Sequence, residues 1–323
     1  MTMTRLNRPL LHLGQALHAR AYRFTSVTPL TQQRVNARPQ SAWATDLAGV
    51  FGWSRPFQRD TVGEELFGLM DSAGVLRELE GGGWLSTVRW SSLDDELYVH
   101  SCYPTLQADA VFFGPDSYRF AQAIEQHLRQ HPPERLHRVL DIGCGAGPGA
   151  LVVARACPAA EVLAVDINPL ALEYAEVNAR LAGIGNLRTL RSDLLASIGG
   201  QFDLILSNPP YMLDPQGRVY RDGGGELGTG LALAIIDEAL AQLAPGGCLL
   251  LYTGVAMVTG RDPLLEYCKS TLSEGDFLWS YREMDPDVFG EQLLEPGYEA
   301  VERLAAVVLT VTRSGREEGD WQR

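Results

Sequence analysis

Three stretches of this chain combine glycine and acidic residues in a way that suits the binding of a nucleoside. The loop containing Gly143, Gly145 and Gly147 follows an apolar run, and without Cβ atoms its backbone could pass close to a ligand. Asp166 follows the next apolar run, where a carboxylate can accept hydrogen bonds from both hydroxyls of a ribose. Asp193 follows a third run, where it could accept a hydrogen bond from an adenine amino group. Taken alone, the glycine loop is equally typical of a dinucleotide site or of a tight turn without a ligand.

A fourth stretch, residues 208–211, reads Asn-Pro-Pro-Tyr and ends the apolar run 202–207. Its two prolines stiffen the chain and remove two backbone donors at the point where a strand would otherwise continue. This pattern indicates a loop whose rigidity serves to orient its polar and aromatic side chains.

These stretches lie in a region where short apolar strands alternate with amphipathic helices. Strands are predicted at 138–143, 161–166, 187–192, 202–208 and 248–254, with a closing antiparallel pair at 277–284 and 303–311. Helices are predicted at 117–128, 148–157, 169–182 and 230–243, the last followed by a turn at 244–247. Such alternation predicts a parallel sheet covered on both faces. In a sheet of this kind a ligand lies beyond the carboxyl ends of the strands, so the four stretches should meet there.

In this order, the glycine loop, the two acidic residues and Asn-Pro-Pro-Tyr resemble the class I S-adenosylmethionine-dependent methyltransferases. More narrowly, they resemble the branch that methylates planar nitrogens, which contains HemK-type glutamine methyltransferases and N-methyltransferases of adenine or guanine. The resemblance covers about residues 108–312. It implies an α/β fold with a Rossmann-like, seven-stranded sheet that is mostly parallel and has an antiparallel last strand.

The resemblance also implies the cofactor and the residues of the site. The cofactor would be S-adenosylmethionine, with no metal. The implied cofactor-binding residues are Asp141, Gly143, Gly145, Gly147, Asp166, Ile167, Asp193, Leu194 and Asn208. The implied catalytic residues are Asn208, Pro209, Pro210 and Tyr211.

The Asn-Pro-Pro-Tyr loop has a physical reason in such an enzyme. The nitrogen of an amide or aryl amine is a poor nucleophile because its lone pair is delocalised into the π system. If the Asn208 side-chain oxygen and the Pro209 carbonyl accept hydrogen bonds from its two N–H groups, the nitrogen is held with its lone pair pointing at the cofactor methyl group. The Tyr211 ring would then pack on the flat substrate group.

Several positions depart from the HemK pattern. The glycine loop has Ala146 where a serine is usual, and the family's Pro-Arg…Thr-Glu segment is replaced by residues 114–117, Gly-Pro-Asp-Ser. Residues 112–120 resemble the segment that closes over the cofactor in amino-methyltransferases, although a helix start capped by Ser117 or Asp116 is an equal alternative. The glycine-rich residues 220–231 resemble the loop that precedes the fourth helix of HemK-type enzymes, and their glycines indicate a mobile wall of the substrate pocket. These differences do not affect the implied methyl-transfer chemistry, but they leave the identity of the methyl acceptor undetermined.

The chain divides into two predicted domains. Residues 1–105 form an accessory domain for substrate recognition, and residues 106–323 form the methyltransferase domain. In the first, a helix at 61–76 precedes two strands, 84–92 and 96–101, so this α+β domain resembles a winged-helix module.

The charge and cysteine content of the chain limit the kinds of partner that it can bind. The net charge is −13, yet residues 1–60 carry eight arginines against Asp46 and Asp60, a balance of +6 that leaves −19 for the rest. An acidic body argues against tight non-specific binding of nucleic acid. Five scattered cysteines fit reduced thiols in a cytoplasmic protein, and no apolar run is long enough to span a membrane.

Three functions therefore remain. The first is N-methylation of a glutamine amide in a protein of the translation machinery, and the second is N-methylation of an exocyclic amine in ribosomal or transfer RNA. The third is a nucleotide-binding protein without transferase activity. A protein substrate is favoured over RNA, and the sequence does not determine the oligomeric state.

Overall fold

The computed structural model describes residues 7–196, 198–214, 217–273 and 276–315. The α-helices are α1 (Arg8–Ala19), α2 (Pro29–Asn36), α3 (Leu47–Phe51), α4 (Arg59–Ser72), α5 (Pro115–Gln130), α6 (Pro148–Ala156), α7 (Pro169–Leu181), α8 (Gly230–Gln242) and α9 (Pro263–Leu272). Short 3-10 helices are η1 (Pro39–Ser41), η2 (Pro133–Arg135), η3 (Glu226–Gly228) and η4 (Gly290–Leu294). The strands are β1 (Leu76–Glu78), β2 (Trp84–Ser86), β3 (Val88–Leu93), β4 (Glu96–Ser101), β5 (Arg138–Ile142), β6 (Glu161–Asp166), β7 (Leu187–Arg191), β8 (Phe202–Ser207), β9 (Leu243–Val258), β10 (Phe277–Asp285) and β11 (Val301–Arg313).

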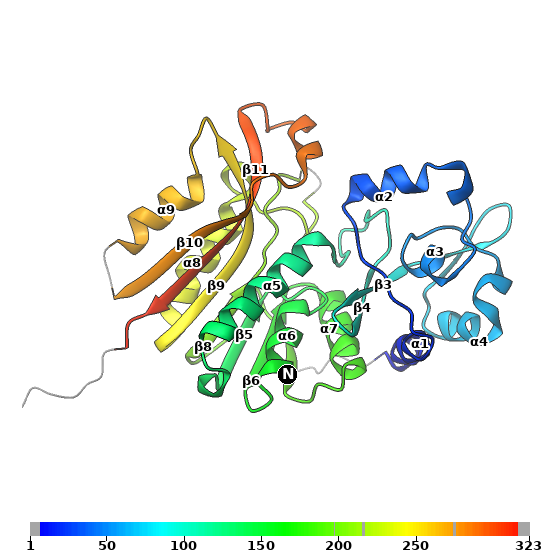
Figure 1. The fold of residues 1–323 in the computed structure, drawn as a ribbon, viewed down its shortest axis with the longest axis horizontal. Coiled ribbons are helices and arrows are strands. Elements are labelled where there is room, and N and C mark those ends of the chain that lie inside the picture. The colour runs from blue at the N-terminus through cyan, green and yellow to red at the C-terminus, as the bar shows by residue number, and fades with distance from the viewer. Residues whose placement is uncertain (1–6, 197, 215–216, 274–275, 316–323) are drawn as a thin grey trace, which may run out of the picture.

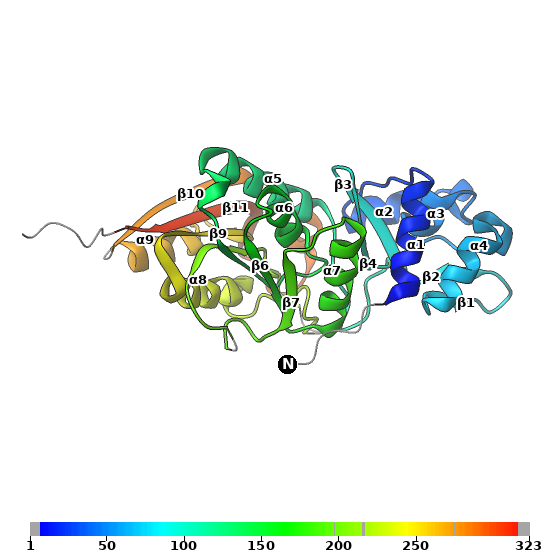
Figure 2. The same ribbon diagram turned by 90° about the horizontal axis from the view of Figure 1, so that it is seen from below.

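Seven strands form one sheet in the order β10–β11–β9–β8–β5–β6–β7 (Figures 1 and 2). Strands β5 to β9 run parallel to one another, whereas β11 is antiparallel to both of its neighbours. The predicted α/β class, with a seven-stranded, mostly parallel sheet and an antiparallel last strand, is thus confirmed. Strand order reverses between β5 and β8, because the chain continues from β5 to β6 on one side and returns to β8 on the other.

Side chains alternate between the two faces of this sheet, which explains why its strands are apolar along their length. On one face Leu140 and Ile205 belong to a core that includes residues of α8 and α9. On the other face Val139 and Leu204 belong to a core that includes residues of α5, α6 and α7.

The core on the α5–α7 face continues into the N-terminal residues. Gly14 of α1 lies against Trp90 and Leu181 of α7, since a Cβ at position 14 would stand 2.6 and 2.9 Å from their side-chain atoms. Val99 of β4 and Asn178 of α7 exchange two hydrogen bonds, Val99 N to Asn178 Oδ1 at 2.8 Å and Asn178 Nδ2 to the Val99 carbonyl at 3.2 Å. Residues before 105 therefore share a core with α7, and the division of the chain at residue 105 stays a prediction.

The N-terminal hairpin differs in part from the prediction. Strands β3 and β4 do pair antiparallel around Asp94 and Asp95. The single strand predicted at 84–92 is wrong, however, because the chain divides at Thr87 and β2 pairs with β1 instead. The Ser86 hydroxyl donates to the Val88 carbonyl at 2.7 Å, a local side-chain bond that competes with strand pairing at this point.

Two predicted boundaries also move. Helix α4 ends at Ser72 rather than 76, because Gly74 adopts φ 68° and stops the helix in the left-handed conformation. The turn predicted at 244–247 lies within β9, where Gly246 has φ 79° and the register with β8 shifts. The predicted turn residues therefore form an irregular part inside β9 rather than a turn before it.

Candidate active site

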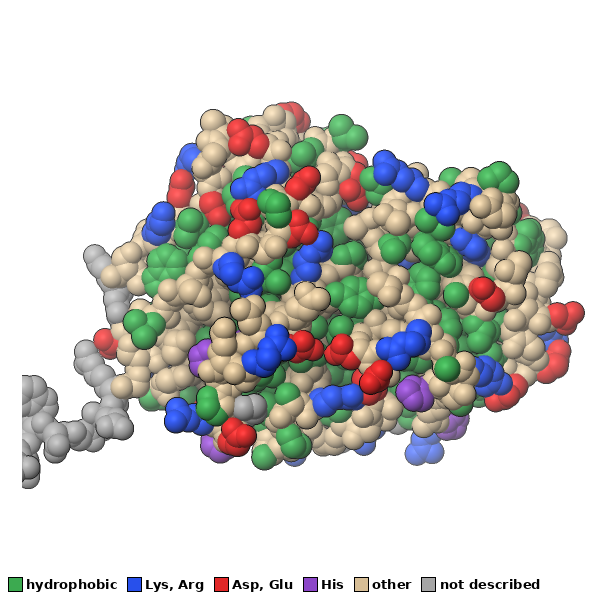
Figure 3. All heavy atoms as spheres, viewed as in Figure 1, with side chains coloured by type: hydrophobic (Ala, Val, Ile, Leu, Met, Phe, Trp, Pro, Cys, Tyr) green, Lys and Arg blue, Asp and Glu red, His purple; other side chains and the backbone are tan. Residues whose placement is uncertain are grey.

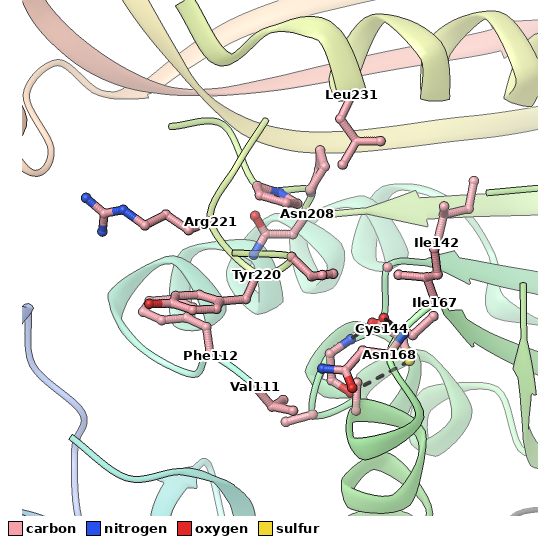
Figure 4. Close-up of a pocket in the computed structure, with 18 of the residues that line it drawn as sticks. Val111, Phe112, Ile142, Cys144, Ile167, Asn168, Asn208, Tyr220, Arg221 and Leu231 are labelled. Carbon is pink, nitrogen blue, oxygen red and sulfur yellow. Dashed lines mark hydrogen bonds between the residues drawn. The ribbon is translucent and has the colours of Figure 1, made fainter. Parts of the chain in front are cut away.

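A cavity of about 240 Å³ opens at the carboxyl ends of β5, β6, β7 and β8, where the strand order reverses. Figure 4 shows Asn208 facing this cavity, with Val111 and Phe112 on one side and Cys144 and Asn168 on the other. The four stretches that the sequence singles out therefore surround one space.

The glycine loop after β5 forms one wall. Gly143 and Gly145 line the cavity in left-handed conformations, with φ 67° and 54°. A Cβ atom at either position would meet no protein atom within 4 Å. A side chain there would occupy open space rather than clash with the protein, so the loop fits a cofactor that lies directly against its backbone.

Asp166 stands beside this loop at the end of β6. Its Oδ2 accepts a hydrogen bond from the Gly145 N–H and its Oδ1 one from the Asn168 N–H, both at 2.9 Å. Burial raises the pKa of Asp166, and the backbone N–H groups act in the opposite direction. Since a carboxylate has about four acceptor positions, capacity remains for the two hydroxyls of a ribose.

Two residues expected in the cofactor set do not line the cavity. Asp141 lies beneath the loop, 1% exposed, where its Oδ2 accepts the Ala150 N–H of α6 at 2.8 Å. Burial raises its pKa to about 7. Gly147 begins α6 at φ 85°, and a Cβ there would stand 2.8 Å from Leu151. Asp141 therefore joins β5 to α6, and Gly147 begins that helix; the spacing of the motif alone could not distinguish these positions from ligand contact.

The remaining expected cofactor residues do line the cavity. Ile167, Asp193 and Leu194 come from the strand ends of β6 and β7. Ile167 is 43% exposed and Asp193 is exposed as well, so this side of the cavity is its open rim. Their assignment to the ribose and the adenine stays a prediction.

The loop after β8 forms the opposite wall, with Asn208, Pro209, Pro210 and Tyr211 all in the lining. Asn208 is half-buried, and its side-chain amide makes no hydrogen bond to another residue in the described part of the chain. Its oxygen and nitrogen are therefore available to a bound molecule.

Tyr211 is oriented differently from the other three. It is 6% exposed, its ring lies over Gly254 of β9, and its hydroxyl donates to Asp116 Oδ2 at 2.5 Å. A Cβ at position 254 would stand 2.1 Å from the Tyr211 ring, which explains a glycine in the middle of a buried strand. The expected packing of the ring on a substrate stays a prediction, because the hydroxyl is already held by Asp116.

The segment after this loop folds back on it. Met212 N donates to the Arg221 carbonyl at 3.1 Å, and the Tyr220 hydroxyl donates to the Thr105 carbonyl at 2.9 Å. A Cβ on Gly228 would stand 2.2 Å from the Tyr211 carbonyl oxygen. Close packing on the loop thus accounts for a glycine at position 228, and the mobility of residues 220–231 stays a prediction.

Several lining residues were not predicted from the sequence. Asn168 caps α7, where its side chain accepts the Leu170 N–H at 3.0 Å, and it also lines the cavity. Pro29, Thr105 and Phe289 come from segments with no motif. Only the fold could bring them to the strand ends.

The charged residues of the lining are Asp116, Asp166, Asp193 and Arg221. Arg221 bonds to Gln292 Oε1, and its Nε lies 3.9 Å from Asp214 Oδ1. The cavity is therefore acidic, which suits a cationic ligand such as a sulfonium better than a polyanion. Within the described residues there is no group of three or more His, Cys, Asp or Glu that could hold a metal, and no helix long and apolar enough to cross a bilayer.

Comparison with known proteins agrees with this geometry. Residues 119–259 match the model of the methyltransferase small domain. This part of the chain is therefore similar to a methyltransferase small domain. Its range includes the glycine loop, Asp166 and the Asn208–Tyr211 loop, although the match does not test the role of any single residue.

Two curated relatives carry the same name. The release factor glutamine methyltransferase of Deinococcus radiodurans is 42% identical over 139 residues, which are 40% of this chain and 48% of that protein. The enzyme of the same name from Koribacter versatilis is 35% identical over 181 residues, 52% of this chain and 60% of that protein. The chain thus spans about half the length of the curated relatives it matches. Among solved structures, the M. jannaschii tRNA m1G37 methyltransferase aligns with a TM-score of 0.49 and 18% identity, covering 74% of this chain and 61% of that one.

These matches confirm the resemblance to class I S-adenosylmethionine-dependent methyltransferases of the HemK type and support S-adenosylmethionine as the cofactor.

Proposed function

We propose that this chain is an S-adenosylmethionine-dependent N-methyltransferase that modifies a glutamine amide in a protein, with a translation release factor as the first candidate. The observation that carries the proposal is that Asn208, with an unoccupied amide, shares one cavity with Gly145 and Asp166. The names of the curated relatives support the choice of acceptor. A cytoplasmic location belongs to the same proposal.

Each residue of the site has a separate role in the proposed reaction. Gly143 and Gly145 let the cofactor lie against the backbone, and Asp166 accepts from its ribose; when bound, the cofactor supplies an electrophilic methyl group. Asn208 Oδ1 and the Pro209 carbonyl accept hydrogen bonds from the two N–H groups of the substrate amide. This leaves the nitrogen lone pair facing the methyl group, so the chain contributes orientation. No strong base is required, because the methylated nitrogen is cationic and loses its proton readily.

Charge around the cavity supports a protein acceptor over RNA. The cavity holds three carboxylates and one arginine, and that arginine lies beside Asp214. Its neighbour Arg218 forms an ion pair with the same carboxylate at 2.6 Å. On the face shown in Figure 3, basic and acidic side chains are interspersed over the surface. A phosphodiester chain would find few unpaired cations at this opening.

The rim of the cavity supports the same choice. Ile167, Val219 and Leu106 are 43%, 46% and 67% exposed; the first two line the cavity, and Leu106 follows Thr105, which does too. Exposed apolar side chains at a rim suit contact with a protein loop.

Transfer of a labelled methyl group from S-adenosylmethionine tests the proposal. The purified chain is incubated with an extract of cells that lack it, and portions are treated with nuclease or protease before the label is counted. We expect label that resists nuclease, disappears with protease and maps to a glutamine by mass spectrometry. Label that nuclease removes would replace the protein acceptor by RNA. Tight binding of NAD without binding of S-adenosylmethionine would favour a nucleotide-binding protein without transferase activity.

A further inference from the structure

Asp116 occupies an unusual position for a charged residue. It is 3% exposed, it lines the cavity, and it lies in the first turn of α5, within the Gly-Pro-Asp-Ser segment that departs from the HemK pattern. Its side chain does not cap the helix, because Ser117 Oγ is the group that accepts the Gly114 N–H, at 3.3 Å. The carboxylate must therefore be buried for another reason.

That reason is a pair of tyrosines. Asp116 Oδ2 accepts from the Tyr211 hydroxyl at 2.5 Å, and Oδ1 accepts from the Tyr252 hydroxyl at 2.7 Å. Arg119 adds an ion pair to Asp116 Oδ1 at 3.3 Å and a second one to Asp285 of β10 at 2.7 Å. Short bonds between a hydroxyl and a buried carboxylate are among the stronger hydrogen bonds in proteins.

The network ties the motif loop to elements that are far away in sequence. Tyr211 is the last residue of Asn-Pro-Pro-Tyr, Tyr252 belongs to β9 and Asp116 to α5. Pro209 and Pro210 restrict the backbone between Tyr211 and Asn208. A hydroxyl held at one end of so stiff a loop limits how far the amide at the other end can turn.

We propose that Asp116 is a positioning residue for the Asn208–Tyr211 loop. It acts through the Tyr211 hydroxyl and fixes the direction of the Asn208 amide. In this chain the Gly-Pro-Asp-Ser segment thus has a function in catalysis beyond starting α5. The inference rests on the proposed N-methyltransferase function, because Asn208 is taken to orient the acceptor amide.

Tyr211→Phe is the gentlest test, since it removes only the hydroxyl and keeps the ring over Gly254. The matched control is Tyr281→Phe: the Tyr281 hydroxyl also donates to a carboxylate, Asp262 Oδ2, at 2.6 Å, and neither residue lines the cavity. Both variants should lose a similar amount of thermal stability. We expect Tyr211→Phe to lower kcat at least about tenfold, with cofactor affinity unchanged, whereas Tyr281→Phe keeps the wild-type kcat.

Amide hydrogen exchange provides a second readout that needs no acceptor. The Met212 and Gly223 N–H groups are bonded to the Arg221 and Met212 carbonyls at 3.1 and 2.9 Å, so they report whether the loop is held. Tyr211→Phe should speed their exchange, and Tyr281→Phe should not. Equal losses of kcat in the two variants, or unchanged exchange in Tyr211→Phe, would overturn the role of Asp116. If the wild-type protein transfers no methyl group but exchange is still faster in Tyr211→Phe, the proposed function is rejected. The role of Asp116 in holding the loop is then kept.

Discussion

The carboxylate of Asp166 accepts a hydrogen bond from the Gly145 N–H at 2.9 Å, which joins the end of β6 to the loop after β5. One side chain thereby sets the position of the loop and presents its remaining acceptor positions to the cavity. Loss of this carboxylate should affect both.

Asp166→Ala should weaken S-adenosylmethionine binding by more than about tenfold, since each hydrogen bond to a charged group contributes roughly 1.5–3 kcal/mol. Asp203→Ala is the matched control. Asp203 also joins two segments through backbone N–H groups, those of His137 and Arg138 at 2.8 Å, but it lies outside the cavity lining. Calorimetric titration should show normal affinity for the control, and normal affinity for Asp166→Ala would reject its assignment.

Asn208→Ala should separate chemistry from binding. Because the amide orients the acceptor rather than the cofactor, transfer should fall at least about a hundredfold while cofactor affinity stays close to that of the wild type. Single-turnover transfer and calorimetry on the same preparation measure the two quantities. Wild-type turnover in the variant would show that the loop has another purpose.

Asp141 should make stability depend on pH. Its pKa rises from 3.8 to about 7 on folding, so the folded state retains a proton that the unfolded state has lost. Stability from this group is fully present below about pH 4 and is lost as the pH rises to about 7.

Asp141→Asn keeps an oxygen for the Ala150 N–H and removes the titration. Between pH 5 and pH 8, the fall in unfolding free energy should therefore be smaller in the variant, by on the order of 2–3 kcal/mol. Denaturant melts at the two pH values measure this difference. Parallel pH profiles for variant and wild type would show that Asp141 is not buried as an acid.

Binding to RNA should be weak and should depend little on salt. Each neutralised phosphate would add about −0.7 to −0.9 to the slope of log affinity against log salt, and the cavity offers few unpaired cations for that purpose. Filter binding of the full chain to total RNA at several salt concentrations gives the slope. Tight binding at low salt that collapses by about 0.2 M would favour an RNA acceptor.

The sequence by itself determined the repeating strands and helices and the order of the motifs along them. Short apolar runs that alternate with amphipathic helices predict strands buried on both faces, and Gly143, Asp166 and Asn208 each lie at the end of one of them. Because the carboxyl ends of parallel strands meet at one edge, the place of the cavity followed from the chain order alone.

Only the tertiary structure decided which motif residues face that cavity and which hold the walls. Asp141 and Asp166 both follow the motif pattern, yet the first lies under α6 and the second at the cavity, since burial depends on what packs above each strand end. The partner of Tyr211 lies 95 residues earlier in the chain. A hydrogen bond between Asp116 and Tyr211 leaves no local pattern, because it forms only when α5 packs against β9 and brings the carboxylate beneath the motif loop.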